Sequence, residues 1–347
     1  ADGTISAALS VNKTTTINTS GSLSLSGTNT FKGNVILTAG EDITLNAASA
    51  FTIAANTGST AQCKNLTVNS DVKLAGNLIT KNSMIFNQNL TLSANAKLQT
   101  TDSSGLITFV KNAGDATATN SAYTLTIDSN LYFGQNAKAN PSLLQFSSDS
   151  AITISSQNIS QINFACNLSL ATGSTATLSS PAKVSGDFTN AGTFNAESRL
   201  DLYADSVNSG SIVQTDEIYF NEGVSSVSDS GSWTIDDDSY IHFANTSAEL
   251  TFTSSFSANE YRFDTSSASQ PVNFEGSSAS SKMIIKAYRD SYSSSSACDG
   301  CTFKNVNFSQ GQTFTKNLIA IDAVLFSGAN TFAGLTLKGN VEFKASD

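Results

Sequence analysis

The chain has 347 residues, of which 39% are hydrophobic and 13% are charged, about half of the ~25% charge that is usual in a globular domain. It has 18 basic and 28 acidic residues, which give a net charge of −10. Because so few Lys and Arg are present to neutralise phosphates, we do not expect the chain to bind nucleic acid. A single His makes a His-based metal site or a His-assisted hydrolase hard to build, and no apolar run reaches the ~18 residues of a membrane span.

Short alternating segments run through the whole chain. Each has an apolar residue, a variable residue and a second apolar residue, which is the period-2 pattern of a β-strand. Turn-forming Ser, Asn, Asp, Gly and Thr separate them, and no segment has a convincing helical period. We therefore expect an all-β protein with strands at Ile43-Thr44-Leu45, Phe51-Thr52-Ile53, Leu66-Thr67-Val68, Leu90-Thr91-Leu92, Leu125-Thr126-Ile127, Ile152-Thr153-Ile154, Leu168-Ser169-Leu170, Ile218-Tyr219-Phe220, Trp233-Thr234-Ile235 and Leu335-Thr336-Leu337.

A Phe-x-x-Asn motif recurs among these segments. Two copies extend into nearly the same heptamer, one starting at Phe86 and the other at Phe164. We expect the Phe to fill the interior and the Asn to occupy the turn into the next strand. There its amide tolerates a left-handed conformation and can bond the backbone of a neighbouring coil. The motif starts at Phe31, Phe86, Phe109, Phe133, Phe164, Phe256 and Phe314.

One stretch has a regular period. The segments that begin at Leu250, Tyr261, Val272 and Met283 are 11 residues apart, and two such strands make about 22 residues, close to one coil of a β-solenoid. A strand this short cannot bury its apolar face alone, so stacked coils supply the core and the backbone hydrogen bonds. The predicted fold is a single-stranded right-handed parallel β-helix. It forms one continuous solenoid over residues 1–347, with loop excursions near residues 101–122 and 276–300.

The four cysteines are of two kinds. Cys63 and Cys166 occupy similar positions beside Asn-Leu, and we expect them to be small buried hydrophobes. Cys298-Asp-Gly-Cys301 follows a run of serines that indicates an exposed loop. A zinc site needs four ligands and a thioredoxin-type motif needs a βαβ unit, so the spacing favours a local disulfide between Cys298 and Cys301. Free thiols, or a metal or redox site, are the alternatives.

The best candidate for catalysis is a run of three aspartates, because polysaccharide-cleaving β-helices use paired carboxylates with Ca²⁺ or a basic residue. Consecutive residues alternate faces on a strand, so the run more simply predicts a solvated turn, and His242 is expected as a surface strand residue. The chain has no nucleophile elbow, P-loop or dinucleotide fingerprint, and we expect neither enzymatic activity nor a cofactor. The residues concerned are Asp236, Asp237 and Asp238, with Glu217, Glu222 and His242 and the basic residues Arg262, Lys282, Lys286 and Arg289.

Long, weakly charged chains of such triplets, rich in Ser, Thr and Asn, resemble the passenger domains of bacterial type V autotransporters. The segment Phe303-Lys-Asn-Val-Asn-Phe308 and the Phe-x-x-Asn-Leu motif are most similar to the self-associating adhesin and vacuolating-cytotoxin-like families. The resemblance covers essentially the whole chain. It implies a right-handed parallel β-helix displayed on the bacterial cell surface, with this chain as a passenger fragment.

The resemblance predicts a secreted, cell-surface β-helix that mediates adhesion to host cells or bacterial self-association. Its faces of Ser, Thr and Asn would contact a host glycan or protein, or identical passengers on neighbouring cells, through many weak hydrogen bonds. One alternative is the receptor-binding part of a vacuolating-cytotoxin-like toxin, and a remote one is a polysaccharide-degrading β-helix enzyme. We expect neither a nucleic-acid partner nor a membrane-spanning segment in this chain.

Overall fold

The computed structural model describes residues 3–344 with a number of gaps. Within that part every regular element is a β-strand, and no helix there is long and apolar enough to cross a membrane. The all-β class expected from the alternating segments is therefore confirmed. The positions left out between residues 3 and 344 are 8, 14, 18–22, 26–29, 32–34, 38–42, 46–50, 54–64, 75, 93, 112, 115–122, 135–137, 142, 147–150, 157–160, 247–249 and 292–298.

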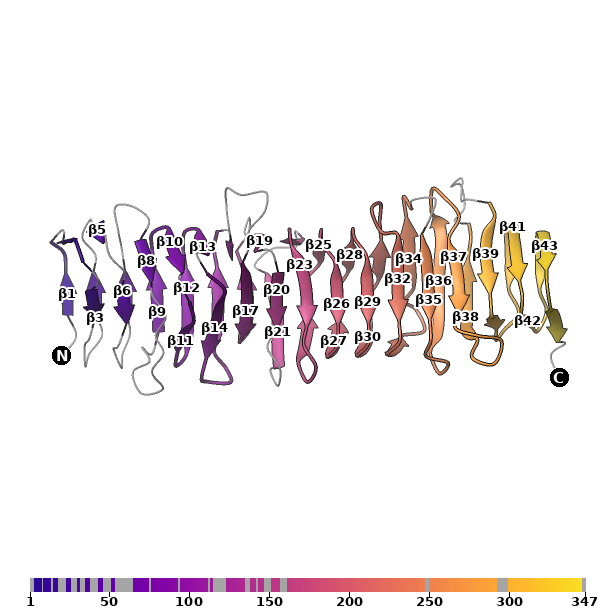
Figure 1. The fold of residues 1–347 in the computed structure, drawn as a ribbon, viewed down its shortest axis with the longest axis horizontal. Helices are drawn as coiled ribbons and strands as arrows, with labels where there is room; N and C mark the ends of the chain where they lie inside the picture. Colours follow the sequence, from indigo (N-terminus) through magenta and orange to yellow (C-terminus); the bar gives the residue numbers. More distant parts are fainter. Residues whose placement is uncertain are drawn as a thin grey trace. The chain divides into compact units, whose positions relative to one another are not determined.

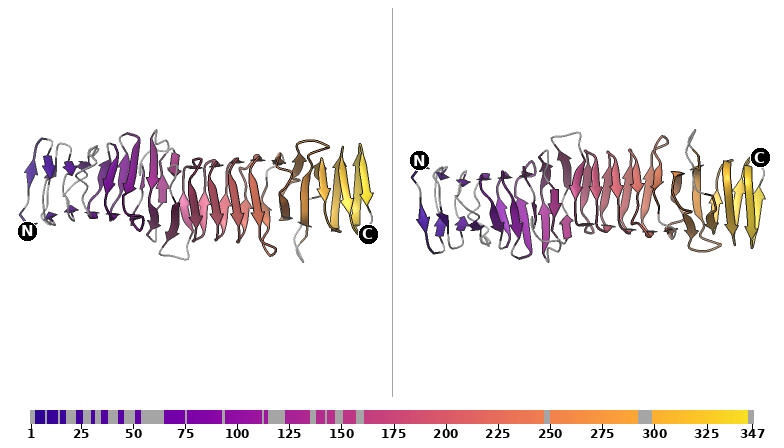
Figure 2. Two further views of the ribbon diagram at one scale, coloured as in Figure 1. Left: turned by 90° about the horizontal axis from the view of Figure 1, so that it is seen from below. Right: turned by 90° about the horizontal axis from the view of Figure 1, so that it is seen from above.

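The chain forms two compact units, Ala1–Ser180 and Pro181–Asp347. In each unit the chain winds through successive turns, and each strand pairs in parallel with the equivalent strand of the next turn. Leu66 is thus paired with Met84 in the first unit, and Leu200 with Ile218 in the second. The equivalent strands form parallel sheets, which we number 1, 2 and 3 in the order in which a turn passes through them (Figures 1 and 2). This is the predicted parallel β-solenoid.

The strands of the first unit are short. Sheet 1 contains β1 (Gly3–Ile5), β4 (Leu23–Leu25), β7 (Ile43–Leu45), β9 (Asn65–Val68), β12 (Ser83–Phe86), β15 (Leu106–Phe109), β18 (Asn130–Phe133), β21 (Ala151–Ser156) and β24 (Thr175–Leu178). Sheet 2 contains β3 (Thr15–Ile17), β6 (Val35–Leu37), β8 (Phe51–Ile53), β10 (Val72–Leu74), β13 (Leu90–Leu92), β16 (Ala113–Gly114), β19 (Lys138–Asn140) and β22 (Ile162–Phe164). Sheet 3 contains β11 (Leu78–Thr80), β14 (Ala96–Thr100), β17 (Thr124–Asp128), β20 (Leu143–Phe146) and β23 (Asn167–Leu170), and β2 (Ser10–Val11) pairs separately with β5 (Thr30–Phe31).

The second unit includes longer strands. Sheet 1 contains β27 (Thr193–Ala196), β30 (Ser211–Gln214) and β33 (Ser232–Ile235). Sheet 2 contains β25 (Ala182–Val184), β28 (Leu200–Leu202), β31 (Ile218–Phe220), β34 (Ile241–Ala244), β36 (Glu260–Ser267), β38 (Met283–Arg289), β40 (Val306–Phe308), β42 (Val324–Ser327) and β44 (Val341–Lys344). Sheet 3 contains β26 (Phe188–Asn190), β29 (Ser206–Asn208), β32 (Ser226–Asp229), β35 (Thr251–Ser254), β37 (Asn273–Gly276), β39 (Cys301–Lys304), β41 (Thr313–Ile321) and β43 (Thr331–Lys338).

The alternating residues of each segment point in turn to the inside and the outside of the solenoid. In β13, Leu90 and Leu92 point inward while Thr91 is only partly covered, because successive side chains on a strand face opposite ways. All ten predicted triplets lie on strands. Within the second unit the inward residues form stacks of aromatic rings, with Phe274 and Phe303 5.1 Å apart and nearly parallel.

The predicted 22-residue coil is present in the second unit. The four segments at 11-residue spacing belong to β35, β36, β37 and β38, which alternate between sheets 3 and 2. Thr251 and Asn273, 22 residues apart in sequence, are paired across successive turns. Among the described residues of this unit sheet 1 ends at β33, so each later turn passes through two sheets instead of three.

The Phe-x-x-Asn prediction is confirmed for most of the described Phe but is wrong at several positions. Asn317 lies within β41, and Asn167 is the first residue of β23. Phe86 is buried, and the Asn89 side chain donates to Asp71 of the preceding turn at 3.1 Å. Phe256, however, is 39% exposed, because it lies in the turn after β35 and not on a strand. In this copy of the motif the Asn is buried instead of the Phe, since Asn259 is 3% exposed. Phe109, Phe133, Phe164 and Phe314 are buried as expected. The Phe31 side chain and the motif residues Asn34, Asn112 and Asn136 lie outside the described part.

Sharp corners link sheet 3 to sheet 2 late in the second unit. Asn305 alone connects β39 to β40 and has a φ of 52°, in the left-handed region that Asn tolerates better than most residues. Its side chain donates to the backbone oxygen of Gly276 in the neighbouring turn at 3.2 Å. This is the role that the sequence predicted for a turn asparagine.

The two regions predicted to hold loop excursions contain both strands and turns. In the first, near residues 101–122, β15 pairs with β12 and β18. In the second, near residues 276–300, β38 pairs with β36 and β40. The strand that begins at Met283 was expected from the 11-residue period, whereas β15 was not marked by the sequence pattern. Described turns lie at residues 101–105 and 277–282, whereas residues 115–122 and 292–298 lie outside the described part.

The cysteines are described in part. Cys166 is 6% exposed, as expected of a small buried hydrophobe. Cys301 begins β39 and is 2% exposed, and its sulfur accepts a hydrogen bond from the Val272 backbone N–H at 3.4 Å. Cys63 and Cys298 lie outside the described residues, so the disulfide between Cys298 and Cys301 stays a prediction.

Candidate functional site

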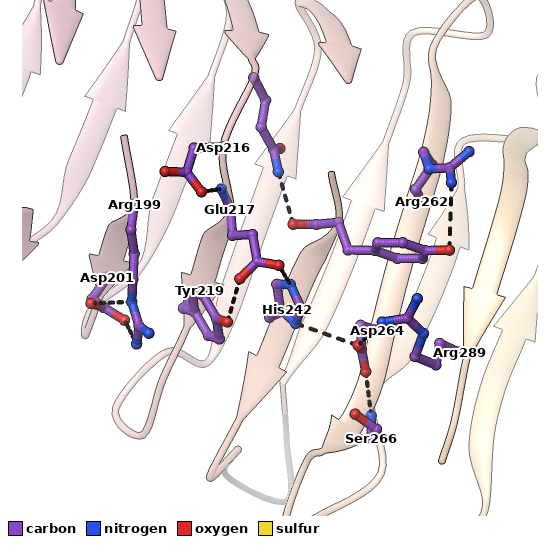
Figure 3. A network of polar contacts seen from close by, with 12 residues as sticks. Arg199, Asp201, Asp216, Glu217, Tyr219, His242, Arg262, Asp264, Ser266 and Arg289 are labelled. Atoms are coloured by element: carbon purple, nitrogen blue, oxygen red, sulfur yellow. Dashed lines mark hydrogen bonds and ion pairs between the residues drawn. The ribbon is translucent and has the colours of Figure 1, made fainter. Parts of the chain in front are cut away.

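Two of the rarer side-chain types, Arg and His, meet on one surface. The chain has only three Arg and one His, and all four lie on the outer side of sheet 2 in the second unit (Figure 3). They lie beside two of the eight Tyr, Tyr219 and Tyr240. We call this surface the arginine–tyrosine face. It consists of Arg199, Tyr219, Tyr240, His242, Arg262 and Arg289 with the carboxylates that touch them.

The strand register places these groups in columns. Asp201, Tyr219 and His242 are the middle residues of apolar–x–apolar segments in β28, β31 and β34, and they are paired in that order across three turns. The column continues with Asp264 on β36 and Arg289 on β38. Since side chains at paired positions on one face lie about 5 Å apart, each group meets the next without any loop to position it.

One part of the face is a closed stack. The Arg199 guanidinium lies 3.9 Å from the centre of the Tyr219 ring, and the His242 ring stacks 4.3 Å from that ring at 10°. Arg199 donates two hydrogen bonds to Asp201, from Nε at 3.0 Å and from Nη2 at 2.8 Å. This bidentate geometry is the strong form of an arginine–carboxylate pair.

Two carboxylates complete this stack. The Tyr219 hydroxyl donates to Glu217 Oε2 at 2.5 Å, and burial together with that carboxylate raises the pKa of Tyr219 far above its ordinary value of 10.0. His242 lies between Glu217 and Asp264, with Nε2 3.2 Å from Glu217 Oε1 and Nδ1 3.5 Å from Asp264 Oδ2. These groups tie three turns together.

The other part of the face surrounds Tyr240 and is more open. The guanidinium of Arg289 lies 4.2 Å from the centre of the Tyr240 ring, and that of Arg262 lies 5.0 Å away. Arg289 Nη1 donates to the buried Asp264 at 3.3 Å. Lys286 Nζ lies 3.2 Å from Asp237 Oδ1 and 3.6 Å from Glu260 Oε2. Cation–π contacts of this kind hold planar cations against a ring.

The structure brings together only some of the residues proposed from the sequence. Asp236, Asp237 and Asp238 form an exposed turn after β33, as expected. Of the three, Asp237 reaches the basic residues. Glu217, His242, Arg262, Lys286 and Arg289 belong to the face, whereas Glu222 lies in an exposed turn after β31 and Lys282 lines a separate hollow.

Sequence reasoning missed Arg199, Asp201, Tyr219, Tyr240 and Asp264. A usable signal was present, because Asp201, Tyr219 and His242 each occupy the middle of a segment such as Leu200-Asp201-Leu202. Aligning those segments one below another puts the three in a column. The distribution of Arg along the chain was a second signal.

Two hollows lie elsewhere in the second unit. One of about 210 Å³ is bordered by Ser228, Thr253, Glu275, Lys304 and Asn305, where sheet 3 turns toward sheet 2. The other, of about 420 Å³, is bordered by Lys282, Asn340 and Glu342. Among the described residues no three His, Cys, Asp or Glu are grouped so that they could hold a metal ion.

Comparison with known proteins adds no relative. No family model matches the chain, and neither the curated proteins nor the solved structures searched include a significant match. The arrangement must therefore be interpreted from its own chemistry. Planar cations and tyrosines on a rigid parallel sheet form a preorganised binding surface, since each is held by neighbours on adjacent strands.

Proposed function

We propose that this chain is an adhesive module, displayed outside a bacterial cell, that binds its partner through the arginine–tyrosine face. The observation that carries the proposal is that all three Arg and the single His lie on one outer surface of sheet 2, beside Tyr219 and Tyr240. Tyr and Arg are the residues most enriched at the energetic centres of interfaces.

The rest of the chain supports such a role. A surface of small neutral side chains with little charge offers weak hydrogen bonds, so a compact cluster of Arg and Tyr would dominate the binding energy. Many copies on a cell would multiply a modest affinity. Adhesion to host cells and bacterial self-association both fit a face of this type.

The test uses bacteria that display the chain. The variant replaces Tyr240 with Ser and Arg289 with Gln. A matched control replaces Thr253 with Ala and Lys304 with Gln on the outer side of sheet 3. We expect the face variant to lose adhesion or aggregation by roughly tenfold or more, which corresponds to one hot-spot contact, and the control to retain it. Equal losses in both variants, or none in the face variant, would refute the proposal, provided that circular dichroism shows both to be folded.

Counting bound host cells and bacterial clumps separately identifies the partner. Loss of host-cell binding alone indicates a host ligand. Loss of clumping alone indicates self-association.

A further inference from the structure

Two arginines on the same face differ sharply in how well their charge is satisfied. Arg199 makes two short hydrogen bonds to Asp201. Arg262 has a side chain only 15% exposed, yet its nearest carboxylate oxygen, on Asp237, is 3.6 Å from Nη1. Its Nη2 is 3.5 Å from the Tyr240 hydroxyl, and its Nε is buried without a hydrogen-bond partner in the described part of the chain.

This geometry is costly for a guanidinium. Arg presents planar, forked donors that match a carboxylate in a bidentate pair. A buried N–H that has lost its water and gained no acceptor raises the free energy of the folded state. Arg262 therefore has an unmet preference for a carboxylate. Lys286 and Arg289 lie around the same Tyr240 ring or the same Asp237, so further cations could contact a carboxylate bound at Arg262.

The carboxylate of Asp237 already lies beside Arg262 and Lys286, but it is held only weakly. Its side chain is 82% exposed, and its Oδ1 lies between Arg262 Nη1 and Lys286 Nζ at 3.6 and 3.2 Å. Ion pairs with so exposed a partner contribute little to stability. A ligand carboxylate that replaced Asp237 would therefore lose little by displacing it and could approach Arg262 more closely.

We propose that Arg262 and Lys286, beside Tyr240 and Arg289, bind the carboxylate of an acidic saccharide, which displaces Asp237. This inference rests on the proposed adhesive function and names the class of its ligand.

The surroundings favour a saccharide over an acidic protein. Glu260 is 54% exposed beside Lys286, and Asp236 and Asp238 flank Asp237 in an exposed turn. A surface dense in carboxylates would be repelled by these groups and by the net charge of −10. An acidic saccharide carries each carboxylate among several hydroxyls, and hydroxyls can donate to Glu260, Asp236 and Asp238.

Binding is measured by calorimetry with two carboxylated probes, a hyaluronan hexasaccharide and sialyllactose. The matched probes are the same hexasaccharide with its carboxylates reduced to alcohols, and lactose. We expect at least one carboxylated probe to bind and its neutral counterpart to bind roughly tenfold more weakly or not at all. A tri-aspartate peptide serves as the acidic-protein probe and is expected to bind more weakly than the saccharide.

Three variants carry the argument. Arg262→Gln should weaken binding by roughly tenfold. Asp237→Asn should tighten it several-fold, because it removes the internal competitor. Lys304→Gln, which removes a charge from the outer side of sheet 3 in the same unit, should leave the affinity within about two-fold. If Arg262→Gln fails to fold, Lys286→Gln takes its place and should weaken binding in the same direction.

Three outcomes would overturn the proposal. They are no binding of either carboxylated probe, stronger binding of the tri-aspartate peptide, and weaker saccharide binding by Asp237→Asn. The last would show that Asp237 only stabilises the cluster. If any of them occurs while the face variant still loses adhesion, only the ligand class is wrong. If adhesion survives the face variant, the proposed function fails as well.

Discussion

Asp229 is a carboxylate held inside the second unit. It is 1% exposed and accepts hydrogen bonds from the Asn208 and Asn259 side chains at 2.8 and 2.9 Å, from the Gly231 backbone at 3.1 Å and from the Tyr261 hydroxyl. Burial raises the pKa of Asp229 above its ordinary value of 3.8, and the hydrogen bonds offset part of that rise. The folded protein therefore holds this proton more tightly than the unfolded chain does.

The first prediction follows from the sign of that shift. Because the folded pKa is raised, the stability contributed by Asp229 is full below pH 3.8 and is lost as the pH rises through the folded pKa. Asp229→Asn cannot ionise, so the free energy of unfolding of the wild type should fall relative to that of the variant between pH 4 and pH 7, as measured by urea denaturation.

Asp205 is a control whose pKa is shifted in the opposite direction to that of Asp229. Its burial raises the pKa, but hydrogen bonds from Ser226 and Ser225 outweigh burial and lower the pKa below 3.8. For Asp205→Asn the wild type should therefore gain relative stability as the pH rises. Parallel trends in the two variants would contradict this assignment.

The second prediction concerns the thiols. Burial raises the pKa of Cys166 to about 12, so its reactive thiolate is scarce at neutral pH. In native protein Cys166 should resist iodoacetamide, and in denaturant without reductant Cys63 and Cys166 should alkylate while Cys298 and Cys301 should not, as read by peptide mass spectrometry. So short a disulfide loop should add under ~2 kcal/mol to stability. Alkylation of all four cysteines without reductant would disprove the bridge.

Side-chain roles were predictable only where a residue acts through its own chemistry. Asn305 in a left-handed corner is such a case. The partners of Arg262 were not predictable, because they depend on which residues the register places on adjacent turns.

At the level of elements, aromatic stacks join the last turns of the second unit. The Phe308 and Phe326 rings lie 5.0 Å apart at 4°, and the Phe326 and Phe343 rings 5.2 Å apart at 13°. Each ring belongs to an equivalent strand of sheet 2, so the stack follows the strand ladder from β40 to β44.

The third prediction tests this stack. Phe326 is fully buried, and Phe326→Ala should cost about 3–5 kcal/mol of unfolding free energy, because it leaves a cavity between two rings. Phe256→Ala is the matched control, since Phe256 is 39% exposed, and it should cost under about 0.5 kcal/mol. Urea denaturation compares them, and similar losses would show that the ring stack adds little.

Strand positions were the most predictable elements, because the alternation of apolar residues is a property of each segment alone. The strand β15, inside the stretch near residues 101–122, was missed for the opposite reason. It is fixed by pairing with β12 and β18, and that pairing is invisible in a segment read by itself.

At the scale of the whole molecule, contacts in each unit are made chiefly between adjacent turns. The stability of such a solenoid is approximately a sum of terms for each turn and for each interface between neighbours. A substitution that destabilises one turn should therefore destabilise the turns next to it and have little effect on distant turns.

The fourth prediction applies this to amide hydrogen exchange. In Phe326→Ala, exchange should speed up most in β40, β42 and β44, and progressively less in strands of the second unit farther from the substitution, such as β31 and β28. Mass spectrometry of peptides from each turn gives the profile. Uniform acceleration across the unit would mean that it unfolds as a single cooperative block.

The pairing of Thr251 with Asn273 and of Phe252 with Phe274 has an evolutionary consequence. A gene deletion of residues 253–274 would join Phe252 to Glu275 and leave the surviving strand of sheet 3 with the same faces turned inward and outward. Duplication of the same stretch would add a turn in the same way. Because each turn meets mainly its neighbours, recombination between such equivalent positions can lengthen or shorten the protein without redesigning its core. The length of the solenoid can therefore change during evolution by whole turns.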